Sequence, residues 1–78
     1  MNKEQATRQL LKLGACWDSY SRPGHYRTHP VASYPHEKDI IELPSLKKVT
    51  AYIKMRKQVA GVATEAEAVE IYDEWKYS

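Results

Sequence analysis

The stretch SRPGHYRTHP, residues 21–30, constrains the fold of this chain more than any other part of the sequence. Pro23, Gly24 and Pro30 argue against a helix here, because proline lacks the N–H that a helix interior needs. Residues 22–25 have proline second and glycine third, which is typical of a type II turn. Proline also cannot donate to a strand ladder, so we expect the following strand to be interrupted or ended at Pro30. The turn joins two predicted strands, residues 15–21 and residues 25–34.

Helix signals precede this hairpin, and a third strand follows it. Asn2 and Gln5 form a capping box at the start of a first helix, and Gly14 is a typical helix end. Ala6, Leu10 and Leu13 make one apolar stripe on that helix. After a polar turn at residues 35–39, the run IIEL predicts a short third strand over residues 40–43.

Two more helices are predicted in the second half of the chain. Ser45 caps a helix that ends at Gly61, and Thr64 with Glu67 forms a second capping box. The last helix runs to about Lys76, and its inward side carries Ala68, Ile71, Tyr72 and Trp75.

This order predicts a single α+β domain over residues 1–78, arranged α-β-β-β-α with an extra C-terminal α-helix. We expect a three-stranded antiparallel sheet with both main helices on one face. The other face would then be an open platform.

The charge is unevenly distributed along the 78 residues. Residues 1–63 hold 11 Lys and Arg against 5 Asp and Glu, whereas residues 64–78 hold one Lys against five acids. Such asymmetry points to nucleic acid or a charged protein as a partner, unless the acidic tail packs on the basic body and neutralises it. A core this small also favours stabilisation by a partner, and a homodimer is one such arrangement.

The sequence predicts a cytoplasmic protein. Its N-terminus lacks the apolar run of a signal peptide, and no stretch approaches the roughly 20 apolar residues of a membrane span. The single cysteine, Cys16, excludes an internal disulfide framework and fits a reducing compartment. Because Cys16 stands beside Trp17 at a helix-to-strand junction, we expect it to be a small core residue rather than a nucleophile.

The histidines of the hairpin are not expected to hold a metal ion. His25 and His29 are four residues apart, which suits a zinc site on a helix. In a strand, four residues span roughly 13 Å, too far for two ligands of one ion. We therefore expect no metal and no other cofactor.

General acid–base chemistry at His25 is the sharper hypothesis for this stretch. If Tyr26 and Thr28 face the helices, then His25, Arg27 and His29 share the open face of the sheet. An imidazole can take and return a proton at neutral pH, and an arginine nearby can hold a phosphate. That combination suits cleavage of RNA by its own 2′-hydroxyl. The alternative is a solvated strand face whose histidines have no chemical role.

The run RQLLKLGA, the following Trp17 and the stretch SRPGHYRTHP resemble the N-terminal half of the HicA toxins. These are small mRNA interferases of HicA–HicB toxin–antitoxin pairs. The resemblance covers roughly residues 5–60, and it implies a fold of the double-stranded-RNA-binding type. It also implies that Gly24-His25 matches the family motif, with His25 as the catalytic base, and that an antitoxin is the protein partner. The serine between glycine and histidine of that motif is missing here.

The predicted second helix is basic throughout. It carries five Lys and Arg and no acid between Pro44 and Gly61. A basic stripe of this kind can contact several phosphates, and double-stranded RNA is read largely through shape and backbone. The side facing away from the apolar residues carries the predicted nucleic-acid-binding lysines, which are Lys47, Lys54 and Lys57.

The acidic last helix supports a different class of function. Glu67, Glu70 and Glu74 form a carboxylate stripe, with Trp75 close by. We expect Glu70, Glu74 and Trp75 to be the partner-binding residues of this alternative, a non-catalytic phage or mobile-element inhibitor or adaptor. It would bind a host protein through this helix and the open sheet face. The residues alone leave both functions open, and with them whether the chain is an enzyme.

Overall fold

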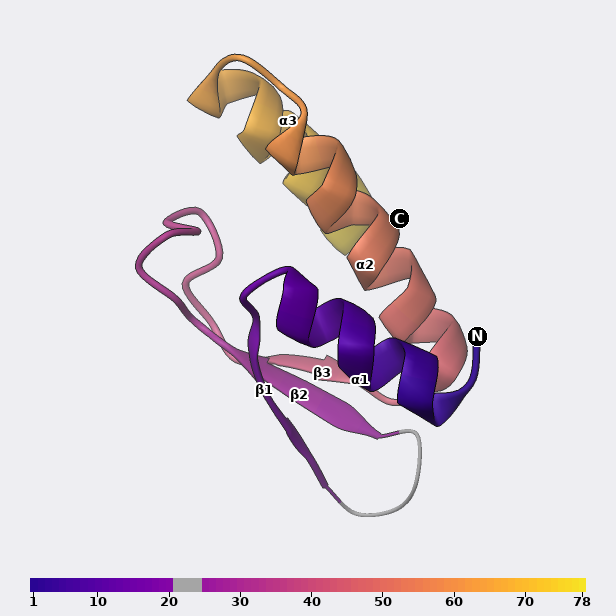
Figure 1. Ribbon diagram of the computed structural model, residues 1–78. Coiled ribbons are helices and arrows are strands. Elements are labelled where there is room, and N and C mark those ends of the chain that lie inside the picture. The colour runs from indigo at the N-terminus through magenta and orange to yellow at the C-terminus, as the bar shows by residue number, and fades with distance from the viewer. Residues whose placement is uncertain (21–24) are drawn as a thin grey trace.

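A computed structural model describes residues 1–20 and 25–78 of the chain. In that part of the chain the elements follow the order α1-β1-β2-β3-α2-α3 (Figure 1). The predicted type II turn at residues 22–25 lies outside the described residues, except for His25. The bounds are α1 Lys3–Lys12, β1 Cys16–Ser19, β2 Tyr26–His29, β3 Ile41–Leu43, α2 Leu46–Ala60 and α3 Glu65–Lys76.

The predicted caps begin and end the helices. The Asn2 side chain accepts a hydrogen bond from the Gln5 N–H at 2.9 Å, and the Gln5 side chain accepts one from the Asn2 N–H at 3.0 Å. Gly14 follows α1 with a φ of 71°, a left-handed conformation that favours glycine. Ser45 and Thr64 cap α2 and α3 by accepting from the backbone N–H three residues later. Capping side chains and the left-handed glycine, all within one turn of the helix ends, therefore determine where the helices begin and end.

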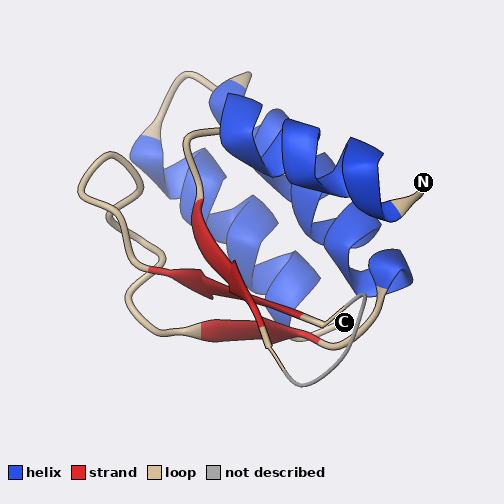
Figure 2. Ribbon diagram, turned by 60° about the horizontal axis from the view of Figure 1, so that its bottom comes forward, coloured by secondary structure: helices blue, strands red, loops and turns tan. Residues whose placement is uncertain are grey.

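The three strands form one antiparallel sheet in the order β1-β2-β3. The strands are shorter than predicted, and β2 ends at His29, directly before Pro30. The helices lie on one side of the sheet, and the other side is left bare (Figure 2). Tyr26 and Thr28 are fully buried under the helices. The predicted α+β domain with one open sheet face is thus confirmed, and α3 is an addition that packs along α2.

A polar network lies inside the core, between α2, β2 and the loop that follows β2. Glu37 and Arg56 retain only 3% and 5% of their exposure. The Tyr52 hydroxyl donates to the Glu37 carboxylate at 2.8 Å, and Arg56 Nη1 donates to the Tyr52 oxygen at 3.3 Å. The Thr28 hydroxyl donates to the same carboxylate at 3.3 Å. We call Thr28, Glu37, Tyr52 and Arg56 the buried network.

The buried network corrects two expectations drawn from the sequence. The sequence predicts a polar turn at residues 35–39, but three hydroxyl-to-carboxylate contacts hold Glu37 of this turn in the core. The sequence also predicts a helix that is basic throughout, without setting apart Arg56, one of its five Lys and Arg. Arg56 lies on the helix side that carries Tyr52 and Val59, so it turns inward with them. Burial and the Glu37 charge both raise the pKa of Tyr52, which keeps its hydroxyl protonated as a donor.

Candidate functional site

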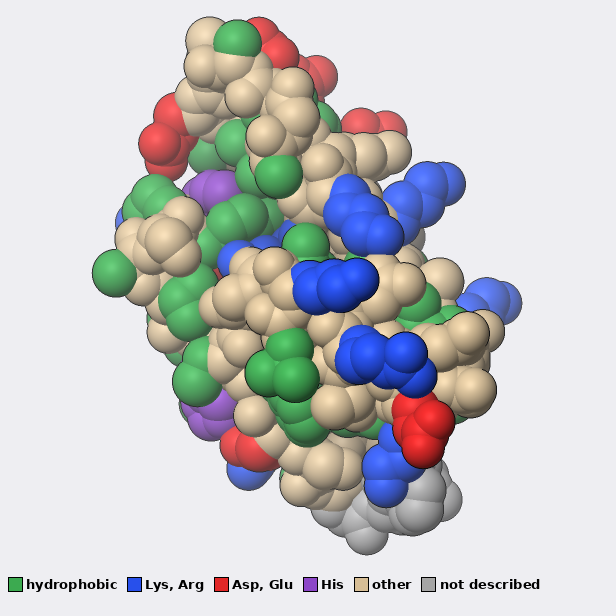
Figure 3. Space-filling model, viewed as in Figure 1, with side chains coloured by type: hydrophobic (Ala, Val, Ile, Leu, Met, Phe, Trp, Pro, Cys, Tyr) green, Lys and Arg blue, Asp and Glu red, His purple; other side chains and the backbone are tan. Residues whose placement is uncertain are grey.

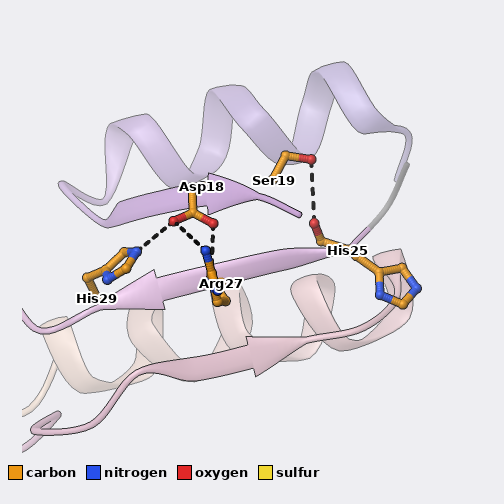
Figure 4. Close-up of polar contacts among 5 residues, drawn as sticks. All are labelled: Asp18, Ser19, His25, Arg27 and His29. Atoms are coloured by element: carbon orange, nitrogen blue, oxygen red, sulfur yellow. Dashed lines mark hydrogen bonds and ion pairs between the residues drawn. The ribbon is translucent and has the colours of Figure 1, made fainter. Parts of the chain in front are cut away.

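The open face of the sheet carries a cluster of three charged or titratable side chains, which we call the open-face cluster: Asp18, Arg27 and His29. Asp18 of β1 pairs with Arg27 of β2 in the antiparallel register. Arg27 Nε and Nη2 approach the two carboxylate oxygens of Asp18 at 3.1 and 3.3 Å, and His29 Nε2 lies 2.8 Å from Oδ2 (Figure 4). One carboxylate therefore holds both an imidazole and a guanidinium.

Hydrogen bonding dominates the electrostatics of the open-face cluster. The pKa of Asp18 lies below its usual value, first because of the hydrogen bond with His29 and then because of that with Arg27. The side chains remain exposed, with 40% of the Asp18 and Arg27 surfaces open to solvent. A carboxylate that orients an imidazole is a common arrangement for proton transfer. Sequence reasoning missed Asp18, although the hairpin register and the alternation of strand residues would have placed it opposite Arg27.

His25 lies apart from the open-face cluster. Its backbone carbonyl accepts from the Tyr20 N–H at 3.0 Å and from the Ser19 hydroxyl at 3.4 Å. Its ring packs edge-on against Tyr20, with centroids 5.8 Å apart. In Figure 4 the ring stands beyond the start of β2, turned away from the Asp18 carboxylate. The predicted catalytic base is thus partly exposed and sits at the hairpin end, without Asp18 as an orienting group.

Arg27 is already engaged within the protein. Besides the two contacts with Asp18, its guanidinium lies 5.0 Å from the centroid of the Tyr20 ring. A phosphate bound by Arg27 would have to compete with the Asp18 carboxylate. The predicted role of Arg27 as a phosphate ligand therefore needs a rearrangement of the open-face cluster.

Cys16 corrects a further expectation. The sequence predicts a core position for it, but it is exposed at the start of β1. Strand alternation explains this position, because Trp17 turns inward onto Tyr26 and its neighbour in sequence must then turn outward. Across the described residues, no group of three His, Cys, Asp or Glu side chains is arranged to hold a metal ion.

The lysines predicted to bind nucleic acid are exposed along one side of α2. Lys47, Lys54 and Lys57 all face solvent, and Lys57 Nζ donates to Gln9 Oε1 of α1 at 2.8 Å. Lys and Arg side chains gather over α1 and α2 in Figure 3. We call this surface the basic face, and define it as the exposed cations of α1 together with the three predicted lysines of α2: Lys3, Arg8, Lys12, Lys47, Lys54 and Lys57.

The basic face and the open-face cluster point in different directions. The basic face belongs to the helical layer, whereas Arg27 and His29 project from the bare side of the sheet. Glu4 is an acid close to the basic face, and its carboxylate lies 4.0 Å from Arg8. The predicted nucleic-acid-binding residues are therefore split, with the three lysines together and Arg27 separate.

The residues predicted for protein binding lie on α3. Glu70 and Glu74 are exposed, and acidic side chains are visible near the outer end of α3 in Figure 3. Trp75 is half-buried, and its ring packs against Tyr52 and Tyr72 with centroids 5.5 and 5.8 Å apart. Trp75 thus anchors α3 on α2, while the two carboxylates remain open to a partner.

Comparisons with protein-family models, with curated proteins and with solved structures found no match for this chain. Within residues 1–20 and 25–78, no helix has the length and apolar character needed to span a membrane.

Proposed function

We propose that this chain is an RNA-binding domain that contacts phosphates through the basic face. The observation that carries the proposal is the side of α2 on which Lys47, Lys54 and Lys57 are exposed together. No acid interrupts that helix, and α1 adds three more exposed cations beside it. Cations spaced along two adjacent helices suit a regular array of phosphates better than a single small anion.

The arrangement of elements supports double-stranded RNA as the ligand. Two helices on one face of a three-stranded antiparallel sheet, in the order α1-β1-β2-β3-α2, are what a fold of the double-stranded-RNA-binding type requires. Such domains read shape and backbone across the wide minor groove, which needs cations but no base-specific motif. In this proposal α3 is an extra helix that leaves the basic face uncovered.

Cleavage of the bound RNA is the finer part of the proposal, and it follows the resemblance to HicA toxins. His25 would take the proton of the 2′-hydroxyl as that oxygen bonds to the adjacent phosphorus. The P–O5′ bond would break, and the leaving 5′-oxygen would take a proton from water. The partial exposure of His25 at the hairpin end allows contact with a strand. Because Asp18 holds Arg27, the phosphates would be held by the basic face rather than by Arg27. An antitoxin would then be the protein partner.

A gel-shift titration with a short RNA duplex tests binding. The variant Lys47→Glu/Lys54→Glu is expected to weaken binding at least about tenfold. The slope of the logarithm of the binding constant against the logarithm of the salt concentration should also become less steep. The expected change is about 0.9 for each phosphate that the variant no longer neutralises. Lys38→Glu/Lys48→Glu is the matched control, since it makes the same change of charge at exposed positions outside the basic face. Equal weakening in both variants would show a general charge effect and would contradict a specific surface.

An RNA cleavage assay with His25→Ala tests the catalytic role. The proposal expects cleavage to disappear while the gel shift stays at the wild-type level. His36→Ala is not a useful control because that ring packs against the buried Tyr34 and Tyr72, so His29→Ala serves instead. Cleavage that survives in His25→Ala and is abolished in His29→Ala would move the catalytic base to the open-face cluster.

A second candidate function is protein binding through α3, as an inhibitor or adaptor. The observation that favours it is the exposure of Glu67, Glu70 and Glu74 on a helix that already has its apolar side covered by α2. Those carboxylates would meet a basic protein surface. The variant Glu70→Lys/Glu74→Lys should abolish capture of such a partner and leave the RNA gel shift intact or stronger. His25→Ala should have no effect on this function.

A further inference from the structure

A groove opens between the loop after β2 and the end of the molecule where α2 turns into α3. Its volume is about 420 Å³, within the range of small-ligand sites. In Figure 3 it corresponds to the hollow at the upper left, where histidine and Lys or Arg atoms are visible between two lobes. We call it the Arg56 groove. The residues used below are Tyr34, His36, Arg56, Val59, Ala63 and Glu65, all of which line it.

Arg56 is a buried cation with unused hydrogen-bonding capacity at the wall of this groove. It is 95% buried, and its hydrogen-bond partners in the described residues are the Tyr52 oxygen, which accepts from Nη1, and the Tyr34 hydroxyl. A guanidinium has five N–H donors. Its carbon lies 4.0 Å from the centroid of the Tyr34 ring, within the range of a cation–π contact.

The counter-charge of Arg56 is present but is not in direct contact with it. Glu37 is reached only through the Tyr52 hydroxyl, which lies 2.8 Å from the carboxylate and 3.3 Å from the guanidinium. In the described part of the chain no direct ion pair joins Arg56 to Glu37. The guanidinium therefore keeps the capacity for a bidentate contact with a planar acid group.

His36 supplies a second, independent observation in the same groove. Its ring is held by Tyr34 and Tyr72, with centroid distances of 4.1 and 5.3 Å. Its Nε2 is buried and has no hydrogen-bond partner within residues 1–20 and 25–78. An unpaired buried nitrogen is unfavourable, because it gives up its bond to water without a replacement. A ligand in the groove, or a water bound with that ligand, would provide the missing hydrogen-bond partner of Nε2 if the His36 ring turned toward the groove.

The rest of the lining selects the kind of ligand. Val59 and Ala63, like most of the other lining residues, are apolar, so an apolar body fits beside the acid group. Glu65 adds one exposed carboxylate at the rim, which opposes a dianion such as phosphate more than a monoanion. From these contacts we propose that the Arg56 groove binds a small monocarboxylate with an apolar body, its carboxylate on Arg56 and its body against Val59 and Ala63.

This site is separate from the proposed RNA-binding function. None of the lysines of the basic face lines the Arg56 groove. Failure of the RNA assays would therefore leave this inference intact, and its own failure would not affect the basic face.

The test is an NMR titration of the full-length chain with benzoate, followed through backbone amides and the Arg56 Nε–H signal. Benzamide has the same shape without the charge, and inorganic phosphate is the dianion probe. We expect saturable shifts of Arg56, Ala63 and His36 signals with benzoate, and at least about tenfold weaker binding of benzamide, because benzamide has no negative charge to pair with the guanidinium. Benzamide or phosphate binding as tightly as benzoate would overturn the proposal.

Three substitutions locate the site without depending on Arg56 itself. Ala63→Leu places a larger side chain in the groove and should abolish the benzoate shifts. Ala66→Leu makes the same change at an exposed position outside the groove lining and should leave them unchanged. Glu65→Gln removes the rim carboxylate and should tighten benzoate binding about twofold or more. Wild-type benzoate binding in Ala63→Leu, or weaker binding in Glu65→Gln, would overturn the assignment.

Discussion

Each face of the sheet carries a carboxylate paired with an arginine, but one pair is buried and the other is exposed. On the helix side, Glu37 and Arg56 are buried and joined through the Tyr52 hydroxyl. On the open side, Asp18 and Arg27 touch directly and are exposed to solvent. Each contact of a buried charge contributes more to stability, because water cannot take the place of a partner that is lost inside the core. An exposed pair can exchange its partner for water at little cost.

The largest expected effect comes from removing the buried carboxylate. Glu37→Ala leaves the Arg56 guanidinium without a counter-charge and the Thr28 and Tyr52 hydroxyls without their acceptor. Breaking a buried pair in this way costs about 3–5 kcal/mol. The total free energy of unfolding of a domain of this size is little larger than that loss. We therefore expect urea unfolding of the variant to lack most or all of the cooperative transition. A destabilisation below about 1 kcal/mol would show that water reaches the buried network.

Removing both buried charges should cost less than removing one. In Glu37→Gln/Arg56→Met the amide oxygen still accepts from Tyr52, and the methionine stem fills the space of the arginine stem. Replacement of a buried ion pair by neutral groups is often close to neutral, so we expect a destabilisation within about 2 kcal/mol by urea unfolding. A double variant as unstable as Glu37→Ala would mean that the charges themselves, and not their balance, stabilise the core.

Tyr52→Phe removes the hydroxyl that links the two buried charges, with an expected destabilisation of about 1–3 kcal/mol. It should also change the alkaline behaviour of the protein. Burial raises the pKa of Tyr52. The contribution of its neutral hydroxyl to the free energy of unfolding is therefore fully present below the ordinary tyrosine pKa, and it is lost as the pH rises above that value. Burial also raises the pKa of Tyr34 and Tyr72 to about 12. The melting temperature should therefore fall less steeply with pH, above about pH 10, in Tyr52→Phe than in the wild type.

The smallest expected effect belongs to the open-face cluster. The pKa of Asp18 is lowered in the folded protein. The contribution of the ionised carboxylate to the free energy of unfolding is therefore present above the usual carboxyl pKa, and it is lost as the pH falls through the lowered value. An NMR titration of the Asp18 carboxyl should show this lowered midpoint. His29→Ala should raise the midpoint more than Arg27→Gln, because the His29 hydrogen bond is the larger cause. The reverse order would show that the Arg27 contact dominates in solution.

Much of the fold is predictable because its signals are local. The Asn2–Gln5 capping box, the Ser45 cap and the left-handed Gly14 depend on residues within one helical turn. Alternation alone puts Tyr26 and Thr28 on the same side of β2, although it does not say which side faces the helices. Sequence reasoning succeeds for these features because no distant contact competes with them.

The parts that sequence reasoning misses depend on contacts between distant residues. Nothing near Glu37 shows that Thr28 and Tyr52 will surround it, since those partners lie 9 and 15 residues away. Arg56 does carry a signal, because it falls on the same helix side as Tyr52, but its charge suggests the surface. Asp18 requires the register of the hairpin, in which it lies opposite Arg27. The exposure of the three predicted lysines of α2 could thus be foreseen, whereas the burial of Glu37 beneath Tyr52 could not.

The order β1-β2-β3 leaves the outer edges of β1 and β3 without a neighbouring strand in the described part of the chain. Open edges invite other chains to add a strand, and natural sheets limit this with short strands and charged side chains. Here the outer strands are four and three residues long, and each carries one carboxylate, Asp18 and Glu42, opposite Arg27. The acids that balance Arg27 thus also discourage the sheet from growing into an aggregate.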